Sequence, residues 1–583
     1  MHHQLNENTT TRWKPTFLLV VSVAVYLLFS ADKPLLAASL FLVATGVLSR
    51  FPLPTFALGS TPHLRPSDVL CATTIWIITA VLRLIHIDAV HSISDLTARF
   101  TLTAIQINQG IHAFPCIPAY EYDESLISWI FAPFLYVFGY RWTTVKTISV
   151  ILSSALTPLA FLWLRRSLPR HNAVFGVAFI VFSRYLQLCD PLISMSRFSA
   201  VAALVLLLLL TTEIMLTPGR SIAWTIPVSL VATTAMYMHS TGRIVVPLLL
   251  WIGFCQWRTA SPSNRPVIRQ RLFFSILLIT IFFIPFLAYT AHHPMYFLFK
   301  KRQIFGVHEH FPFSWSGLLT NTRSVLLNFH YKASLHMHFD ESSPLLLPLT
   351  VIGSLGCIAA MTGRSVSSVM PGWRPALTLS LVPLIAVTPG HWRGLYFTVP
   401  VTLLTLGAGV FFSCVTDSII QWLTRKQTGS RIQQRLTTGF TAGILIVMAA
   451  VRVPTLVDCV QSKPPIDTVT RLYEDMAHEP DIPHYFSARI PEMKRINAIF
   501  HCIGTAWFKE YGIFRFDPMM IVLDEHHGRL LDARCTEGKE IRLVLAPDEI
   551  RRQKEIQSNL GSARMIILER SQLPMVVVNG ASR

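Results

Sequence analysis

The sequence has few charged residues, and few of these are acids. Charged residues make up 14% of its 583 positions, with 32 Asp and Glu against 50 Lys and Arg. An ordinary soluble domain has roughly 25% charged residues. Because hydrophobic residues reach 52%, this composition excludes a typical soluble protein and predicts a chain that crosses a membrane many times.

Metal-site spacing, internal repeats and low-complexity linkers are also absent. The nine cysteines are scattered, so the sequence requires no cofactor, and a divalent metal is left open. The formal net charge of +18 falls in short clusters between apolar runs rather than along one patch. Such clusters are typical of cytoplasmic loops and argue against nucleic acid as a partner.

The apolar runs predict about 13 transmembrane helices. They cover 16–31, 35–49, 69–87, 147–164, 172–189, 199–216, 222–238, 243–257, 272–290, 345–362, 376–388, 394–414 and 437–452. The run 125–139 is shorter than the ~20 residues needed to cross hydrocarbon, so we expect a re-entrant or surface helix there. Basic residues around the first two runs place the N-terminus in the cytoplasm, and an odd number of crossings places the C-terminus outside.

This topology sorts the charges by side. It places three basic clusters in the cytoplasm, at 165–166, 258–271 and 425–435. Before Val453, ten acids lie on the external side and four on the cytoplasmic side, namely Glu7, Asp68, Glu213 and Asp417. The external face is therefore where we expect chemistry.

The longest polar interruption of the first half runs from Arg83 to Gly139. Its acids are Asp88, Asp95, Glu121, Asp123 and Glu124. Hydrophobic residues between 96 and 111 recur at nearly helical spacing, which predicts a helix on the membrane surface. Carboxylates held at a membrane surface indicate a functional site.

The order of residues in this stretch resembles the first external loop of the GT-C glycosyltransferases that use polyprenyl phosphate. The shared features are Asp95, Gly110 fifteen residues later, Pro115, and Tyr122-Asp123-Glu124 ahead of Trp129. Protein O-mannosyltransferases and lipid A aminoarabinose transferases share that fold. The resemblance covers about residues 80–415 and implies an enzyme that moves a sugar from a polyprenyl-phosphate donor to a glycan, lipid or protein acceptor outside.

The resemblance gives Asp95 the role of general base. A hydroxyl acceptor is a poor nucleophile, and a carboxylate within hydrogen-bond reach can take its proton. Direct displacement would invert the anomeric carbon. Taken alone, Asp95 is also explained as a helix cap or a solvated residue.

Asp123 and Glu124 are candidate substrate-binding residues. In the resembling enzymes an acid or His here is followed by Lys-Pro or Pro-Pro, whereas Ser125 follows here. Asp123 could orient the acceptor or a metal, and a solvated acidic turn is the alternative. Asp190 resembles the Asp of the Leu-Asp-Pro motif at the donor site of the aminoarabinose transferases, or it forms an ordinary turn.

Cations elsewhere are candidates for the donor phosphate. Arg393, with His391, resembles a family motif in which an Arg precedes a Tyr and a Pro, and its guanidinium could bind phosphate bidentately. The alternative is a snorkelling Arg beside an interfacial Trp. The loop 291–344 adds candidate substrate-binding residues, and its end loosely resembles the matching loop of the family 39 transferases. These candidates are Lys300, Lys301, Arg302, His338 and Asp340. The alternative is that the bases of this loop have no role, since long loops can cross the membrane whatever their charge.

Beyond Val453 the chain changes to 18 acids and 17 bases in 130 residues, a composition typical of a soluble domain. Strands are predicted at 519–524, 541–546, 563–568 and 574–579, and helices at 487–511 and 548–558. We expect a small external α/β or α+β domain.

We therefore expect an all-α polytopic protein of the plasma (inner) membrane. Residues 1–68 form a transmembrane hairpin and cytoplasmic loop, 69–452 form a GT-C-like catalytic domain with external loops 87–146 and 291–344, and 453–583 form the external domain. A flippase, polymerase or transporter for lipid-linked glycans is the alternative, and should show charges inside several spans and inverted repeats. A third possibility is a non-catalytic GT-C relative, because two features of the family are missing: the Lys-Pro after the acidic residue, and the Asp two residues after Arg197, where Ser199 stands.

Overall fold

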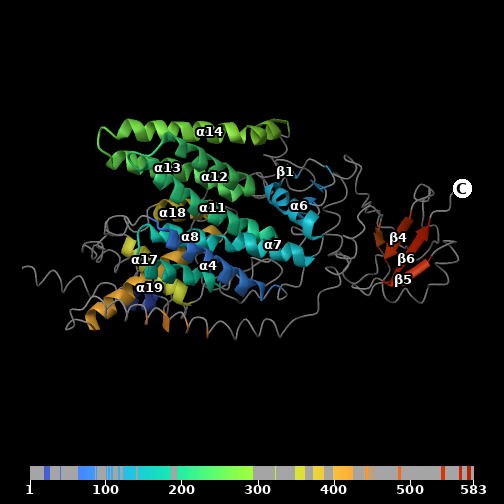
Figure 1. Ribbon diagram of the computed structural model, residues 1–583, viewed down its shortest axis with the longest axis horizontal. Coiled ribbons are helices and arrows are strands. Elements are labelled where there is room, and N and C mark those ends of the chain that lie inside the picture. Colours follow the sequence, from blue (N-terminus) through green and yellow to red (C-terminus); the bar gives the residue numbers. More distant parts are fainter. Residues whose placement is uncertain are drawn as a thin grey trace, which may run out of the picture. The chain divides into compact units, whose positions relative to one another are not determined.

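The structure is a computed structural model of the chain (Figure 1). With short interruptions it describes residues 19–25, 64–87, 100–110, 116–117, 123–139, 142–186, 193–292, 348–361, 372–386, 398–423, four strands after residue 483, and single positions at 40, 322 and between 439 and 450. The chain divides into two compact units. One contains residues 1–86, 150–191 and 195–459, and the other contains 87–149, 192–194 and 460–583.

The first unit is helical. Its α-helices are α4 (Pro66–Leu84), α8 (Leu156–Arg165), α9 (Arg170–Val181), α11 (Ile193–Leu216), α12 (Thr225–Met238), α13 (Val245–Thr259), α14 (Arg265–His292), α17 (Pro348–Met361), α18 (Trp373–Ala386) and α19 (Thr398–Leu423). Two 3₁₀ helices, η2 (Ile222–Trp224) and η3 (Ser240–Ile244), precede α12 and α13. Helix α7 (Trp142–Ser154) leads into α8, and the sequence boundary between the two units falls after residue 149 of α7.

Five helices in the described part of the chain are long and apolar enough to cross a membrane. They cover 66–84, 143–165, 196–216, 265–292 and 398–416, and the shorter apolar helices cover 126–138, 170–181, 222–238 and 349–358. The protein is therefore an integral membrane protein. The expected runs 35–49 and 437–452 lie mostly outside the described residues, so the count of 13 stays a prediction.

Several helices begin earlier than the hydrophobic runs that predicted them. Helix α4 begins at residue 66 rather than 69, α11 at 193 rather than 199, and α14 at 265 rather than 272. The added turns carry polar and charged side chains, which a hydropathy criterion leaves out. Helices in membrane proteins can continue past the hydrocarbon, because their backbone hydrogen bonds are satisfied internally in either solvent.

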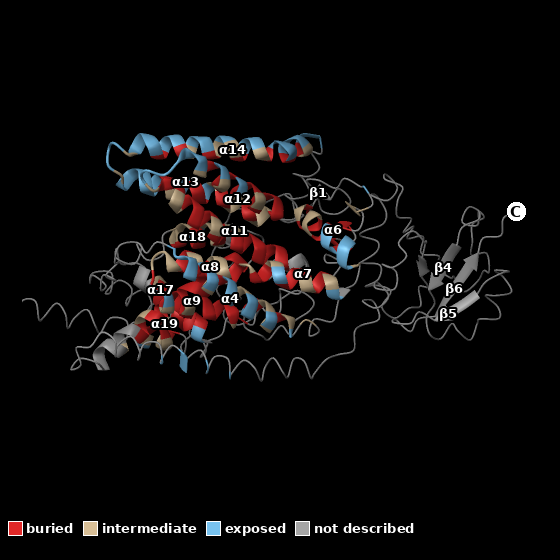
Figure 2. Cartoon of the chain, in the orientation of Figure 1, coloured by how far each residue is buried: buried red, intermediate tan, exposed pale blue. Residues whose placement is uncertain are grey.

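The core of this unit depends on close helix contacts through small residues. Helix α19 packs against α9 and α17. A Cβ added at Gly409 would lie 2.6 Å from the Cα of Gly176, and one added at Gly353 would lie 2.8 Å from the Cβ of Ala408. Such small-residue contacts let backbones approach closely in membrane proteins. Figure 2 shows buried residues along α8, α9 and α11, whereas much of α14 is exposed.

We expect Gly409→Val to destabilise this unit, because the side chain would meet the backbone of Gly176, which cannot move aside as a flexible side chain could. Overpacking of this kind costs ~1–3 kcal/mol or more. Thermal unfolding of the detergent-purified protein measures it. Gly443→Val is the matched control, since a Cβ at Gly443 meets nothing within 4 Å. Equal unfolding temperatures for the two variants would contradict the proposed contact.

The second unit contains a short hairpin, a helix and a sheet. Strands β1 (Cys116–Ile117) and β2 (Asp123–Glu124) pair antiparallel, and α6 (Leu126–Phe138) follows. The sheet contains β3 (His484–Phe486), β4 (Glu540–Val544), β5 (Arg564–Ile567) and β6 (Pro574–Asn579). Its order is β3-β4-β6-β5, with β3 parallel to β4 and the other pairs antiparallel.

Three predicted strands fall on this sheet. The segments 541–546, 563–568 and 574–579 overlap β4, β5 and β6. Strand β3 was not expected, because three residues are too few to show a two-residue period. The segment 519–524 and both predicted helices, 487–511 and 548–558, lie outside the described residues.

Candidate functional site

A buried carboxylate lies where β2 leads into α6. Glu124 is 0% exposed and pairs in register with Cys116 on β1. The two serines that follow, Ser125 and Ser128, are also fully buried. The Oγ of Ser128 donates a hydrogen bond of 2.9 Å to the backbone carbonyl of Phe100. Glu124 is thus held between the hairpin and the start of α6.

A second hydrogen bond connects α6 to the helical residues around 100–108. The Nδ2 of Asn108 donates to the carbonyl oxygen of Ala132 at 2.8 Å. Phe100 and Ala104 are buried, at 1% and 0% exposure. Residues 100, 101, 103, 104, 107 and 108 are helical. The helix predicted between 96 and 111 is therefore confirmed at these positions, and its place on the membrane surface stays a prediction.

The alternative of a solvated acidic turn is wrong for Glu124, because its side chain is fully buried. Taking a carboxylate out of water is costly, so a buried one is retained with polar partners and commonly marks a functional position. The backbone of Asp123 pairs with Ile117, and its side chain lies outside the described residues.

The first unit contains a cluster of cations and aromatic rings where α11 begins and α12 ends. We call it the aromatic–cation cluster; it consists of Arg197, Phe198, His239, Arg243 and Phe286. The guanidinium of Arg197, a buried residue at 3% exposure, lies 5.1 Å from the ring centroid of Phe198. The ring centroids of Phe198 and His239 lie 4.3 Å apart. The contact joins the first turns of α11 to the end of α12.

His239 also shapes the 3₁₀ helix that follows. Its Nδ1 accepts a hydrogen bond from the backbone N–H of Thr241 at 3.1 Å. Because a backbone N–H can only donate, the proton of the neutral ring lies on Nε2. Gly242 is required in this turn, since a Cβ there would lie 1.9 Å from the carbonyl oxygen of Ala235. This turn positions Arg243.

Arg243 contacts a third helix. Its guanidinium lies 4.7 Å from the ring centroid of Phe286 on α14, and Phe286 lies 6.2 Å from the ring of Tyr237. The hydroxyl of Tyr237 donates to the carbonyl of Phe282 at 3.1 Å. Cation–π contacts orient guanidinium groups, and an oriented guanidinium is well suited to bind phosphate. His239 and Arg243 were missed by the sequence analysis, which found no motif around them.

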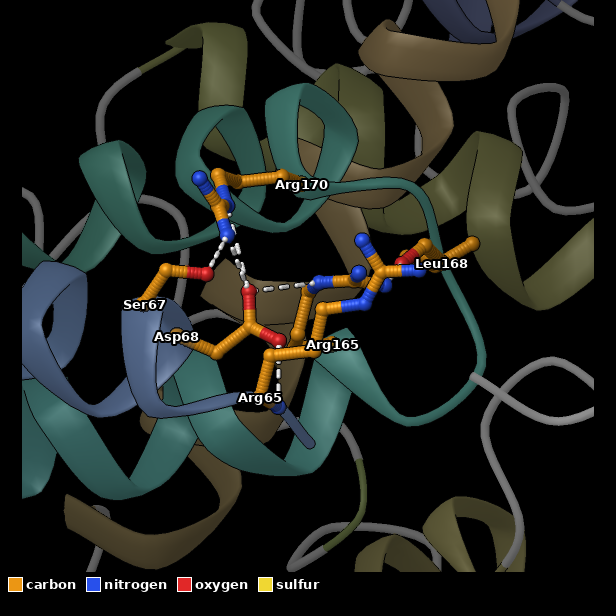
Figure 3. A network of polar contacts seen from close by, with 6 residues as sticks. All are labelled: Arg65, Ser67, Asp68, Arg165, Leu168 and Arg170. Carbon is orange, nitrogen blue, oxygen red and sulfur yellow. Dashed lines mark hydrogen bonds and ion pairs between the residues drawn. The ribbon is translucent and has the colours of Figure 1, made fainter. Parts of the chain in front are cut away.

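A different polar network, shown in Figure 3, joins α4, α8 and α9. The carboxylate of Asp68 is 0% exposed and accepts hydrogen bonds from the Nε of Arg165 at 3.0 Å and the Nη2 of Arg170 at 2.9 Å. Its other oxygen accepts from the backbone N–H of Arg65 at 3.0 Å. Arg170 also donates to the hydroxyl of Ser67 at 2.7 Å. Two cations thus neutralise one buried acid.

Two further contacts extend this network to α11 and α14. Arg166 forms an ion pair of 3.3 Å with Glu213. The guanidinium of Arg271 donates to the backbone carbonyls of Met215, Thr217 and Arg220, where α11 ends. Carbonyls at a helix end lack intrahelical partners, and a cation satisfies them. All these residues belong to segments that the topology prediction placed on the cytoplasmic side.

We expect Asp68→Asn to destabilise the protein by ~1–3 kcal/mol, because it removes the buried anion that Arg165 and Arg170 contact, while both guanidinium groups keep some exposure to water. Arg165→Gln should cost more than Arg170→Gln, since the side chain of Arg165 is 12% exposed and that of Arg170 is 45% exposed. Exposed ion pairs contribute only ~0–1 kcal/mol. Thermal unfolding in detergent ranks the three variants, and equal losses for Arg165→Gln and Arg170→Gln would contradict this ordering.

The remaining predicted site residues lie outside the described residues. They are Asp95, Asp190, Lys300, Lys301, Arg302, His338, Asp340, His391 and Arg393. Among the residues that the structure does describe, no group of three or more His, Cys, Asp or Glu is arranged to hold a metal ion.

Comparisons with known proteins give matches only among solved structures. No protein-family model and no curated protein matches the chain. The chain is similar to ArnT from Cupriavidus metallidurans bound to undecaprenyl phosphate, with a TM-score of 0.49 and 12% identity over 89% of this chain and 99% of that chain. The chain is also similar to ArnT from Cupriavidus metallidurans in the apo state. The TM-score is 0.44 and the identity 12%, over 88% of this chain and 97% of that chain.

A further similarity is to the archaeal oligosaccharyltransferase AglB from Archaeoglobus fulgidus in complex with an inhibitory peptide and a dolichol-phosphate. The TM-score is 0.42 and the identity 11%, over 75% of this chain and 64% of that chain. These solved structures are of GT-C proteins, the group that the first loop resembles.

Proposed function

We propose that the chain is a membrane glycosyltransferase that moves a sugar from a polyprenyl-phosphate donor to an acceptor on the external face. The observation that carries the proposal is the acidic stretch 83–139, whose residue order resembles the first external loop of such enzymes. Support comes from Glu124, which is fully buried beside α6. A buried carboxylate in this stretch is typical of a structured functional site rather than of a solvent-exposed loop.

Asp95 is the proposed general base. The hydroxyl oxygen of the acceptor attacks the anomeric carbon, the bond from that carbon to the phosphate oxygen breaks, and the polyprenyl phosphate leaves. The hydroxyl proton passes to the Asp95 carboxylate, so charge and atoms balance. A single displacement inverts the anomeric carbon. Asp123, Glu124 and Asp190 are proposed to orient the two substrates.

The donor phosphate requires cations. Arg393, with His391, and the group Lys300 to Arg302 are the proposed phosphate-binding residues. His338 and Asp340, from the same loop as the lysines, are proposed substrate-binding residues. Arg197 and Arg243 of the aromatic–cation cluster are added to the phosphate-binding residues. Their guanidinium groups are already oriented by aromatic rings, so little rotamer entropy is lost when they bind an anion.

One observation favours an enzyme over a flippase, polymerase or transporter. Within the described spans, every buried charged residue lies within about two turns of a helix end. These residues are Asp68, Arg83, Lys146, Arg197 and Arg271. Transporters bind substrates near the bilayer midplane, whereas charges at helix ends fit chemistry at a membrane surface.

The first test separates catalysis from binding. Asp95→Asn removes the base, so it should lower the transfer rate ~100-fold or more while leaving donor affinity nearly intact. Arg393→Ala and Arg243→Ala should instead weaken donor binding, each by the ~1.5–3 kcal/mol of a lost charge-assisted hydrogen bond. Purified protein with radiolabelled polyprenyl-phosphate sugars measures both quantities.

Gln256→Ala is the control for these variants, because Gln256 is an exposed, neutral residue near the end of α13. It should change neither rate nor affinity. Normal transfer by Asp95→Asn would show that Asp95 is a helix cap rather than a base. Donor binding without any transfer by the unaltered chain would favour the non-catalytic relative.

The second test concerns the sides of the membrane. The proposed topology places the N-terminus in the cytoplasm and the region after Val453 outside. An alkaline phosphatase fused after Arg583 should then be active, because it folds only outside, and a cytoplasmic reporter at the same point should be silent. The reverse pattern would place the region after Val453 in the cytoplasm and remove an external active site.

A further inference from the structure

Basic side chains gather on the turn between α13 and α14. Arg258 lies in the last turn of α13, and Arg265 and Arg269 lie in the first two turns of α14; all three are exposed. None of them forms an ion pair with another described residue. The sequence has no acid between Glu213 and Glu309. The positive charge of this turn is therefore not balanced by its own part of the chain.

The fourth arginine of this region, Arg271, has a different role. Arg271 is buried and donates to the backbone carbonyls of Met215, Thr217 and Arg220. This contact holds α14 against the end of α11. Arg265 donates to the carbonyl oxygen of Ala260 at 3.3 Å within the turn itself. Arg258, Arg265 and Arg269 are all exposed, so their charge is available to a ligand.

The length of α14 places this turn at the level of lipid headgroups. Its 28 residues at ~1.5 Å each give about 42 Å, whereas the hydrocarbon core is about 30 Å thick. The excess of ~12 Å corresponds to about eight residues. Residues 265–271 contain every charged side chain of the helix, and residues 272–292 suffice to cross the hydrocarbon. The first two turns of α14 therefore lie beyond the hydrocarbon.

Exposed aromatic rings mark the same level. Phe254 and Trp257 are 57% and 39% exposed on α13, and Phe273 is 64% exposed on α14. The guanidinium of Arg265 lies 5.5 Å from the ring centroid of Trp257. Trp is typical of the membrane–water interface, and the cation–π contact holds the guanidinium beside it.

We propose that this turn binds the headgroups of anionic phospholipids in the adjoining leaflet. The binding surface is defined by Arg258, Arg265 and Arg269, flanked by Trp257 and Phe273. Phosphate oxygens accept hydrogen bonds from the guanidinium groups, and the aromatic rings contact the upper acyl chains. The inference is independent of the transferase reaction, because it concerns how the chain associates with the bilayer.

The test counts lipids bound to the full-length protein. The protein in detergent is titrated with phosphatidylglycerol or phosphatidylcholine, and native mass spectrometry records the bound lipid. The unaltered chain should retain phosphatidylglycerol preferentially. The variant that combines Arg258→Gln, Arg265→Gln and Arg269→Gln should lose this preference, with affinity falling about five-fold for each residue and on the order of 100-fold in total.

Two matched variants make the result specific. Replacing the same three residues by Lys keeps the charge and should keep the preference for phosphatidylglycerol. The pair Gln256→Ala and Gln270→Ala changes exposed neutral neighbours and should have no effect. If the triple Gln variant does not fold, Arg258→Gln alone should show the five-fold loss. Equal retention of the two lipids by the unaltered chain, or full retention by the Gln variants, would overturn the proposal.

Discussion

The need to neutralise a buried carboxylate organises one end of the helices. Asp68 is fully buried at the start of α4 and is paired with Arg165 and Arg170. Because an unpaired charge in this position would be costly, the end of α8 and the start of α9 must lie beside it. Arg166 with Glu213, and Arg271 with the carbonyls of α11, add two more helices at the same level.

The opposite ends of α11, α12 and α14 differ in chemistry. There, Arg197 and Arg243 contact the rings of Phe198 and Phe286, and His239 caps η3. At the end around Asp68, ion pairs and the hydrogen bonds of Arg271 to backbone carbonyls stabilise the fold. The second end presents oriented cations, which is the arrangement that an anionic lipid phosphate would need.

Close backbone contacts fix the remaining helices. At Gly176 and Gly409 the backbones of α9 and α19 lie so close that no side chain fits between them. Beside them, Phe179 stacks on Phe412 with ring centroids 5.6 Å apart. Packing of this kind is rigid, because a small change in volume cannot be absorbed. This packing holds the polar helix ends in fixed positions. Much of α14 is exposed and can contact lipid.

The sequence by itself determined the membrane class, the approximate position of most of the helices that the structure describes, and strands β4, β5 and β6. These features depend on local hydropathy and periodicity, which can be read in windows of a few residues. It also identified Asp123 and Glu124 as candidates, but left a solvated turn open. Tertiary structure decided that Glu124 is buried, that α14 continues past its apolar run, and which acid meets which base. Arg165 and Arg170 lie 97 and 102 positions from Asp68, and no local pattern encodes such pairs, because they form only when distant helices pack.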